Sequence, residues 1–179
     1  KSDAQMLGDK VAFLTPMSFS VMNRKAEGES VSLAFTKPCL DTEDKFAVIY
    51  DEGTTKATVY KMDRQVYSVA TENKIIKAKV NSNGYLLAAT EKEGYNCECV
   101  VFNKEGEAIF KWDISSSEFL DGAVSLNNNT MVLSVASAKE EKLYYELDTI
   151  RYFISGLATT KFMILEGLSG TGKSSLPRY

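Results

Sequence analysis

A mainly β fold is what this sequence predicts, and three features predict it. Short runs rich in Val, Ile, Tyr and Phe follow one another through residues 11–148, a composition typical of strands. Turn signals that contain Gly, Asn or acidic residues separate these runs. Before Arg151 no stretch has the 3.6-residue apolar periodicity of an amphipathic helix. The body of the chain is therefore expected to be a meander of short antiparallel strands.

The individual strands follow from these runs and from the turns between them. Clear turns stand at 51–55, 81–84, 91–96, 103–107 and 126–130. The expected strands, in chain order, are 11–15, 31–36, 46–50, 57–62, 65–70, 74–80, 85–90, 97–102, 107–112, 123–126, 131–135 and 142–147.

The strands recur as a repeated unit of strand, acidic or Gly-containing turn, and strand. Copies begin at Lys45, Gly84 and Thr130, and a divergent earlier copy begins at Lys10. Their spacing is about 40 residues, the period of a four-stranded propeller blade. We therefore expect residues 1–148 to form an incomplete β-propeller-like domain of about three and a half blades. The alternative is a β-sandwich whose hairpins only look alike.

Composition and charge limit the classes of function that residues 1–148 can have. With 44% apolar residues, 25% charged residues and a net charge of −3, the chain is typical of a globular protein. It contains no histidine, which excludes Ser-His-Asp and Cys-His catalysis and the commonest metal ligand. An acidic body gives no strong signal for nucleic acid. No run of apolar residues is long enough to predict a transmembrane helix.

The three cysteines are interpreted as thiols outside any disulfide framework. Cys97 and Cys99 stand two residues apart on an expected strand, so both point to one face. With Cys39 they are too few for an ordinary structural zinc site in a chain without histidine. Buried thiols are the simpler interpretation, and no active site is assigned to the body.

The last residues carry the one motif with specific chemistry. Gly167, Gly172, Lys173 and Ser174 fit the phosphate-loop pattern G-x-x-x-x-G-K-[ST], directly after an apolar run at 162–165. In such a loop the backbone amides cradle phosphates, the lysine reaches the β- and γ-phosphates, and the serine hydroxyl binds Mg²⁺. ATP and Mg²⁺ are the expected cofactors, with Ser174 as the metal ligand. The expected nucleotide-binding residues are Gly167, Gly170, Thr171, Gly172, Lys173, Ser174 and Ser175.

The same motif lacks the parts that hydrolyse ATP. Only five residues follow Ser174, so no acidic strand, sensor or arginine finger accompanies the loop. Residues 149–179 are therefore predicted to be a truncated α/β fragment of a P-loop domain, without catalytic residues.

Residues 151–179 resemble the start of the McrB-like AAA+ ATPase module. The likeness rests on "FISGLA" followed by a strand and "GLSGTGKSSLP". It implies that Lys173 and Ser174 contact phosphate and Mg²⁺, that the stretch 154–157 approaches the adenine, and that this part is cytoplasmic.

Residues 8–148 resemble an uncharacterised Firmicute family of unknown function. The segments that carry the likeness are "GDKVAFLTPMSFSVMN", "FAVIYDEGTTKATVY", "TENKIIKAKVNSNGYLLAATEKEGY" and "VFNKEGEAIFKW". The resemblance implies a propeller-like β domain behind an N-terminal membrane anchor. Membrane attachment is thus implied for a longer parent protein.

Three functional hypotheses follow from these observations. The first is a non-catalytic β-propeller-like binding or scaffold domain for a protein or small-molecule ligand, joined to a truncated P-loop. The second is an AAA+ ATPase whose β region is an N-terminal recognition domain. The third is a chimera of two unrelated gene fragments, which the short join near 148–151 favours because it contains no Gly/Ser/Pro linker.

We expect that the purified chain does not hydrolyse ATP. A phosphate-release assay with Mg²⁺ checks this, with Lys173→Ala as the matched control that removes the phosphate-binding amine. Turnover that disappears in Lys173→Ala would contradict the prediction and favour the ATPase hypothesis.

Overall fold

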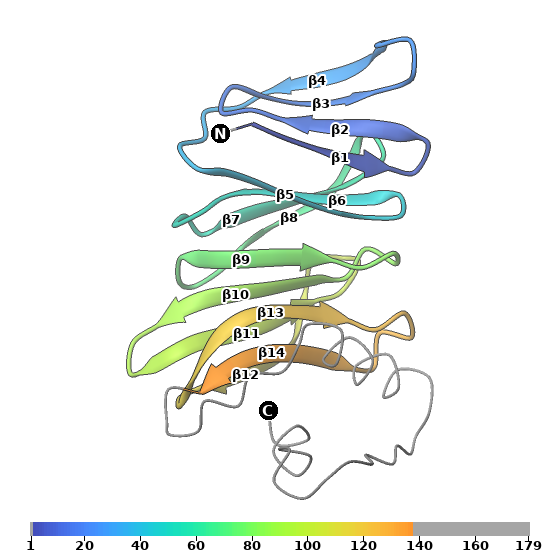
Figure 1. The fold of residues 1–179 in the computed structure, drawn as a ribbon. Coiled ribbons are helices and arrows are strands. Elements are labelled where there is room, and N and C mark those ends of the chain that lie inside the picture. Colours follow the sequence, from blue (N-terminus) through green and yellow to red (C-terminus); the bar gives the residue numbers. More distant parts are fainter. Residues whose placement is uncertain (1, 138–179) are drawn as a thin grey trace, which may run out of the picture.

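The computed structural model describes residues 2–137, and these residues form fourteen strands and no helix (Figure 1). The expected mainly β fold is confirmed. The strands are β1 Asp3–Leu7, β2 Lys10–Leu14, β3 Ser18–Met22, β4 Gly28–Ser32, β5 Pro38–Glu43, β6 Phe46–Asp51, β7 Lys56–Lys61, β8 Arg64–Ala70, β9 Ile75–Val80, β10 Leu86–Lys92, β11 Tyr95–Phe102, β12 Ala108–Ile114, β13 Ser117–Val124 and β14 Met131–Ser137.

The strands form four antiparallel sheets, each built from strands consecutive in sequence. We call them blade 1 (β1–β4), blade 2 (β5–β8), blade 3 (β9–β12) and blade 4, which has β13 and β14 within the described residues. Figure 1 shows the blades stacked in chain order. The first strands of neighbouring blades lie next to one another, β1 by β5, β5 by β9 and β9 by β13. This arrangement is that of a propeller, in which short meander sheets are placed side by side around an axis.

The sequence repeat starts one strand into each blade. Its four copies begin at or just before β2, β6, β10 and β14. Three strands, β1, β3 and β5, were not among the expected ones. The strand expected at 31–36 is in fact β4, which ends at Ser32, and the one expected at 123–126 is the end of β13. The strand expected at 142–147 lies outside the described residues.

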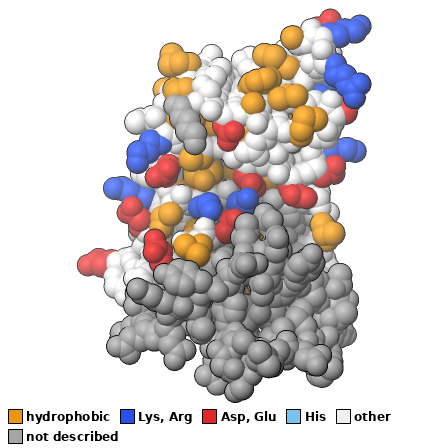
Figure 2. All heavy atoms as spheres, viewed as in Figure 1, with side chains coloured by type: hydrophobic (Ala, Val, Ile, Leu, Met, Phe, Trp, Pro, Cys, Tyr) orange, Lys and Arg blue, Asp and Glu red, His pale blue; other side chains and the backbone are white. Residues whose placement is uncertain are grey.

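Apolar side chains fill the spaces between successive blades. Between blades 1 and 2 the rings of Phe19 and Tyr60 have their centroids 4.7 Å apart, within a cluster that includes Leu14 and Ile49. A second cluster joins blades 2 and 3, and a third joins blade 3 to β13 and β14. Because β6 and β10 are buried on both faces, their sequences are nearly continuous apolar runs. Met6 and Phe13, on the face of blade 1 away from blade 2, are exposed, and hydrophobic side chains are visible over that end of the structure in Figure 2.

Asp51 fastens the linker that connects blade 1 to blade 2. Its carboxylate accepts hydrogen bonds from the backbone N–H groups of Thr36, at 2.9 Å, and Lys37. The Asp51 side chain is buried, so these donors replace the water that a carboxylate would otherwise bind. The linker is thereby held against the end of β6, beside the groove described below.

At the other end of β6, tight packing fixes blade 2 against the turn between β9 and β10 of blade 3. The Tyr67 hydroxyl donates to the Gly84 carbonyl oxygen at 2.7 Å. Gly84 has a φ of +82°, and a Cβ there would lie 2.6 Å from the Phe46 ring. Only glycine satisfies both the left-handed backbone and the close approach.

We expect Gly84→Ala to destabilise the fold more than Gly53→Ala. Both glycines have a φ of +82°, but a Cβ at Gly53 has no atom within 4 Å. Gly53→Ala should therefore cost only the left-handed strain of about 1–2 kcal/mol, whereas Gly84→Ala should add roughly 1–3 kcal/mol of overpacking. Urea unfolding of the two variants measures the difference. Equal midpoints would contradict the role given to Phe46.

Candidate functional site

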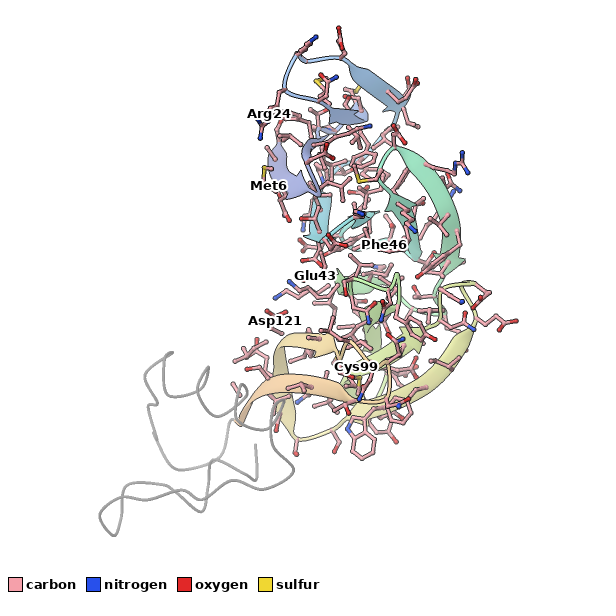
Figure 3. All side chains as sticks on the ribbon, turned by 90° about the vertical axis from the view of Figure 1, so that its right-hand side faces the viewer. Met6, Arg24, Glu43, Phe46, Cys99 and Asp121 are labelled. Atoms are coloured by element: carbon pink, nitrogen blue, oxygen red, sulfur yellow. The ribbon has the colours of Figure 1, made fainter. Side chains whose placement is uncertain are left out.

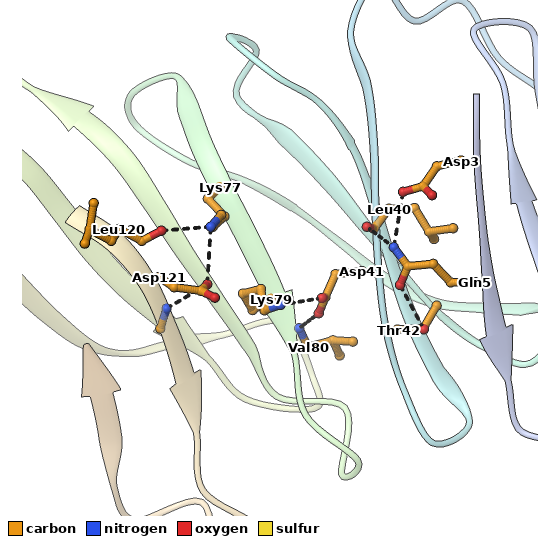
Figure 4. Close-up of polar contacts among 11 residues, drawn as sticks. Asp3, Gln5, Leu40, Asp41, Thr42, Lys77, Lys79, Val80, Leu120 and Asp121 are labelled. Carbon is orange, nitrogen blue, oxygen red and sulfur yellow. Dashed lines mark hydrogen bonds and ion pairs between the residues drawn. The ribbon is translucent and has the colours of Figure 1, made fainter. Parts of the chain in front are cut away.

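The first strands of the blades carry a row of polar side chains that join one blade to the next (Figure 4). Gln5 of β1 donates to the Leu40 carbonyl oxygen of β5 at 2.8 Å. Asp41 of β5 accepts from the Val80 N–H of β9 at 3.0 Å. Lys77 of β9 donates to the Leu120 carbonyl oxygen of β13 at 2.8 Å. Each contact satisfies a backbone group on the open edge of the next first strand.

The charges in this row are neutralised by their neighbours. Lys79 lies 2.7 Å from Asp41, and Lys77 lies 3.4 Å from Asp121. Burial acts to lower the pKa of Lys79, but the hydrogen bond and the negative charge of Asp41 outweigh it and raise that pKa above its usual value. In Figure 3, Met6, Glu43 and Asp121, all from first strands, lie along one side of the stack. With its hydrogen bonds made internally, this row joins blades rather than offering unsatisfied groups to a ligand.

A second charged cluster lies in blade 3 and is also paired. The Glu98 side chain is buried, and its carboxylate is 2.5 Å from the Lys92 amine, which also lies 2.7 Å from Asp113. Hydrogen bonds to Asp113 and to Glu98 raise the pKa of Lys92. Lys111 connects the cluster to Glu72 of the linker between blades 2 and 3, at 2.7 Å. The arrangement holds blade 3 to that linker. The Glu98 carboxylate is buried and paired with Lys92, so it is not placed to accept a proton from a substrate.

Cys97 and Cys99 point to the same face of β11, as the sequence predicted. Their sulfur atoms are 4.0 Å apart, both side chains are buried, and neither is in a disulfide. The hydrogen bond between them lowers the pKa of Cys97 and raises that of Cys99. Among residues 2–137 no group of three or more His, Cys, Asp or Glu side chains is placed to hold a metal ion. The pair therefore packs as small buried thiols between blades 3 and 4.

A groove of about 330 Å³ lies between the outer parts of blades 1 and 2. We call it the rim groove. Its apolar wall comes from β4 and the following linker, and its polar wall from β7 and its neighbours. The lining residues are Val31, Leu33, Ala34 and Phe35 on the first side, and Ile49, Asp51, Thr54, Lys56, Thr58, Tyr60 and Gln65 on the second. Burial raises the pKa of Tyr60, so its hydroxyl stays protonated and can donate or accept at neutral pH.

A larger groove, of about 790 Å³, lies between blade 3 and blade 4. We call it the blade 3–4 groove. Phe110 and Trp112 of β12 pair with Val101 and Cys99 of β11, so their side chains share the face that is turned toward blade 4. Trp112 is 56% exposed and Phe110 is 46% exposed. Leu133 and Val135 of β14 form part of the opposite wall.

The residues predicted to bind nucleotide all lie outside the described residues, so nucleotide and Mg²⁺ binding remain predictions. Both grooves and the row of first-strand contacts were missed by sequence reasoning. A signal for the row was present in the alternation of Asp3 and Gln5, and of Asp41 and Glu43, in segments too polar to resemble strands. The grooves left no such signal because they depend on which strands become neighbours.

Comparison with solved structures supports the propeller-like fold. The Kluyveromyces lactis Hsv2p structure matches with a TM-score of 0.57 and 12% identity, over 74% of this chain and 45% of that one. The WD40 domain of Toxoplasma gondii coronin matches with a TM-score of 0.54 and 11% identity, over 74% and 39%. BamB from Moraxella catarrhalis gives a TM-score of 0.52 and 9% identity, over 73% and 39%. The chain thus spans less than half the length of these structures, and the likeness shows the fold alone.

Two further findings bear on family and membrane. No similar protein was found among the curated proteins. Within the described part of the chain, no helix has the length and apolar character needed to span a bilayer. The McrB-like resemblance of 151–179 and the membrane anchor of a longer parent are not tested by these comparisons. A family of unknown function, DUF5711, matches residues 4–151, which covers nearly all of the predicted β domain, and the chain belongs to that family.

Proposed function

We propose that the β domain is a non-catalytic binding domain that takes an extended segment of a partner protein along β4, with side chains in the rim groove. The observation that carries the proposal is an unprotected strand edge directly beside a groove with one apolar and one polar wall. Strand addition of this kind derives affinity from backbone hydrogen bonds and selectivity from pockets for alternate side chains.

The edge of β4 has backbone groups available for such pairing. The N–H of Asn23 bonds to the Glu27 carbonyl oxygen and the N–H of Leu33 to the Met17 carbonyl oxygen. With the regular β3–β4 register between them, Glu29 and Val31 form the ladder to β3. Gly28, Ser30 and Ser32 therefore direct their N–H and C=O groups outward.

Among the outer strands of the complete blades, β4 is the least protected against pairing. It carries a single charge, at Glu29, and its register with β3 is regular. In contrast, β8 and β12 each contain a register shift, and Lys111 lies within β12. Charges and bulges are the usual means by which a sheet edge prevents pairing. Their scarcity in β4 favours a strand that is meant to be paired.

The lining of the rim groove determines which side chains the partner segment should carry. Val31 points into the groove from β4, so an added strand places alternate side chains against Leu33, Phe35 and Tyr60. These contacts suit an apolar side chain. Lys56 also borders the groove, is exposed and makes none of the ion pairs found among the described residues. The partner is therefore expected to be an extended segment with alternating apolar residues and a carboxylate near Lys56.

The P-loop residues take no part in this proposal. The ATPase hypothesis, with the β domain as its recognition domain, rests on the tail motif alone. If a longer parent is membrane-anchored, as the first resemblance implies, the β domain would bind its partner close to a membrane surface.

Selection of a random linear peptide library, displayed on phage, against the full chain tests the proposal. We expect the selected peptides to alternate apolar residues. Their binding should weaken by roughly tenfold in Ser30→Pro, which removes one outward N–H without touching the ladder to β3. Ser30→Ala is the matched control, because it keeps the N–H and also loses the Ser20–Ser30 hydroxyl contact.

A second pair of variants tests the groove. Val31→Asp places a charge in its apolar wall and should weaken binding, whereas Val66→Asp, on the edge of β8, should not. The two valines are similarly exposed, at 41% and 44%, so their effects on solubility should be comparable. Failure to enrich any peptide, or equal binding to Ser30→Pro and Ser30→Ala, would overturn the proposal.

A further inference from the structure

We infer that two copies of this chain associate through the face of blade 1 that points away from blade 2, with blade 1 packed against blade 1 around a two-fold axis. We call this surface the free face. The inference does not rest on the function proposed above, because packing on the face of a sheet leaves the outer edge of β4 open.

The strand register of blade 1 determines which residues form the free face. The side chains of blade 1 that belong to the apolar cluster with blade 2 are Leu7, Ala12, Leu14, Phe19 and Val21. Neighbouring residues of a strand point to opposite faces, and the aligned pairs extend this alternation to β4. The free face therefore consists of Ala4, Met6, Val11, Phe13, Ser18, Ser20, Met22, Gly28, Ser30 and Ser32. Every one of these residues is uncharged.

The corresponding face of blade 2 shows what such a surface packs against. Phe13 and Ile49 are each the fourth residue of the second strand of their blade. Ile49 is 1% exposed because blade 1 packs over it, whereas Phe13 is 42% exposed. In blade 3, Leu86 and Ala88 are buried in the cluster with blade 2 in the same way. Within this molecule, a face of this kind is thus covered by a four-stranded sheet.

The free face has an apolar half and a half rich in hydroxyl groups. Met6, Val11 and Phe13 lie on β1 and β2, and Met6 is 64% exposed. Serines predominate on β3 and β4, where the Ser20 hydroxyl donates to that of Ser30 at 2.9 Å. A two-fold axis close to β1 and β2 brings the two apolar halves together and leaves the serines at the border. An apolar centre with a polar rim is the usual anatomy of a protein interface.

A second copy of the chain is the occupant that these features favour. Because the residues of the free face are uncharged, packing the face against itself places no like charges opposite each other. Contacts of a surface with its own copy around a two-fold axis are the commonest in soluble oligomers. The flexible thioether side chains of Met6 and Met22 can adapt to fill the space between the two sheets.

The size of the free face sets the expected strength of the dimer. Each strand of blade 1 has five residues, so the four strands cover an area of roughly 300 Å². A standard interface buries about 800 Å² on each partner. The dimer is therefore expected to be reversible and to dissociate at micromolar concentrations of the chain.

Sedimentation equilibrium of the full chain tests the inference. We expect the average mass to rise from that of the monomer toward that of the dimer through the micromolar range. Phe13→Asp should raise the dissociation constant roughly tenfold or more, because it places an unpaired charge at the centre of the interface. Val66→Asp on β8 is the matched control, since Val66 is 44% exposed and lies outside the free face. Urea unfolding checks that both variants are folded.

Disulfide trapping identifies the face that makes the contact. Met6→Cys lies close to the inferred axis, so mild oxidation should link two copies of this variant, whereas Val66→Cys should stay unlinked. The unmodified chain gives the background, since Cys97 and Cys99 are buried and Cys39 is half-buried.

Three results would overturn the inference. The first is a chain that stays monomeric at every concentration. The second is equal cross-linking of Met6→Cys and Val66→Cys. The third is a dimer that survives Phe13→Asp, and its loss in Ser30→Pro would then place the contact on the edge of β4.

Discussion

The structure depends on how the open edge of each first strand is satisfied. Such a strand has a sheet neighbour on one side only, and an unpaired polar backbone group costs free energy when it is shielded from water. Side chains of the preceding blade supply partners, through Gln5 to β5, Asp41 to β9 and Lys77 to β13. The apolar clusters between blades contribute free energy through buried area, which is not directional. These hydrogen bonds are directional, so they fix each blade relative to its neighbour.

This requirement also explains which strands could be predicted from the sequence. The second strand of every blade was found, because each is a nearly continuous apolar run, and in β6 and β10 both faces are buried. The inner strands β1 and β5 were missed, since their sequences DAQML and PCLDTE include the polar residues that join the blades. The inner strand β9 was found because Lys77 and Lys79 alternate with apolar neighbours. A residue that serves the contact between blades weakens the local signal of the strand that carries it.

The candidate surfaces could not be predicted for a different reason. The β4 segment GESVS has one aliphatic side chain and little strand character by itself. Its importance comes from being last in the order of blade 1, where its outer edge adjoins the groove formed with blade 2. The most specific chemistry predicted from the sequence, a P-loop from Gly167 to Ser175, lies outside the described residues. Local motifs identify chemistry, whereas edges and grooves arise only when strands separated in the sequence come together.

The two grooves differ in the blades that border them and in the side chains that line them. The rim groove lies between two complete four-stranded blades, so no strand of either blade is lacking there. Its polar wall, with Lys56, Thr58 and Tyr60, suits a partner that brings both apolar and polar groups. Within the described residues the blade 3–4 groove adjoins the strands β13 and β14, and Phe110 and Trp112 in its wall are exposed. An extended partner segment is therefore proposed for the rim groove, where the outer edge of β4 and walls of both kinds lie together.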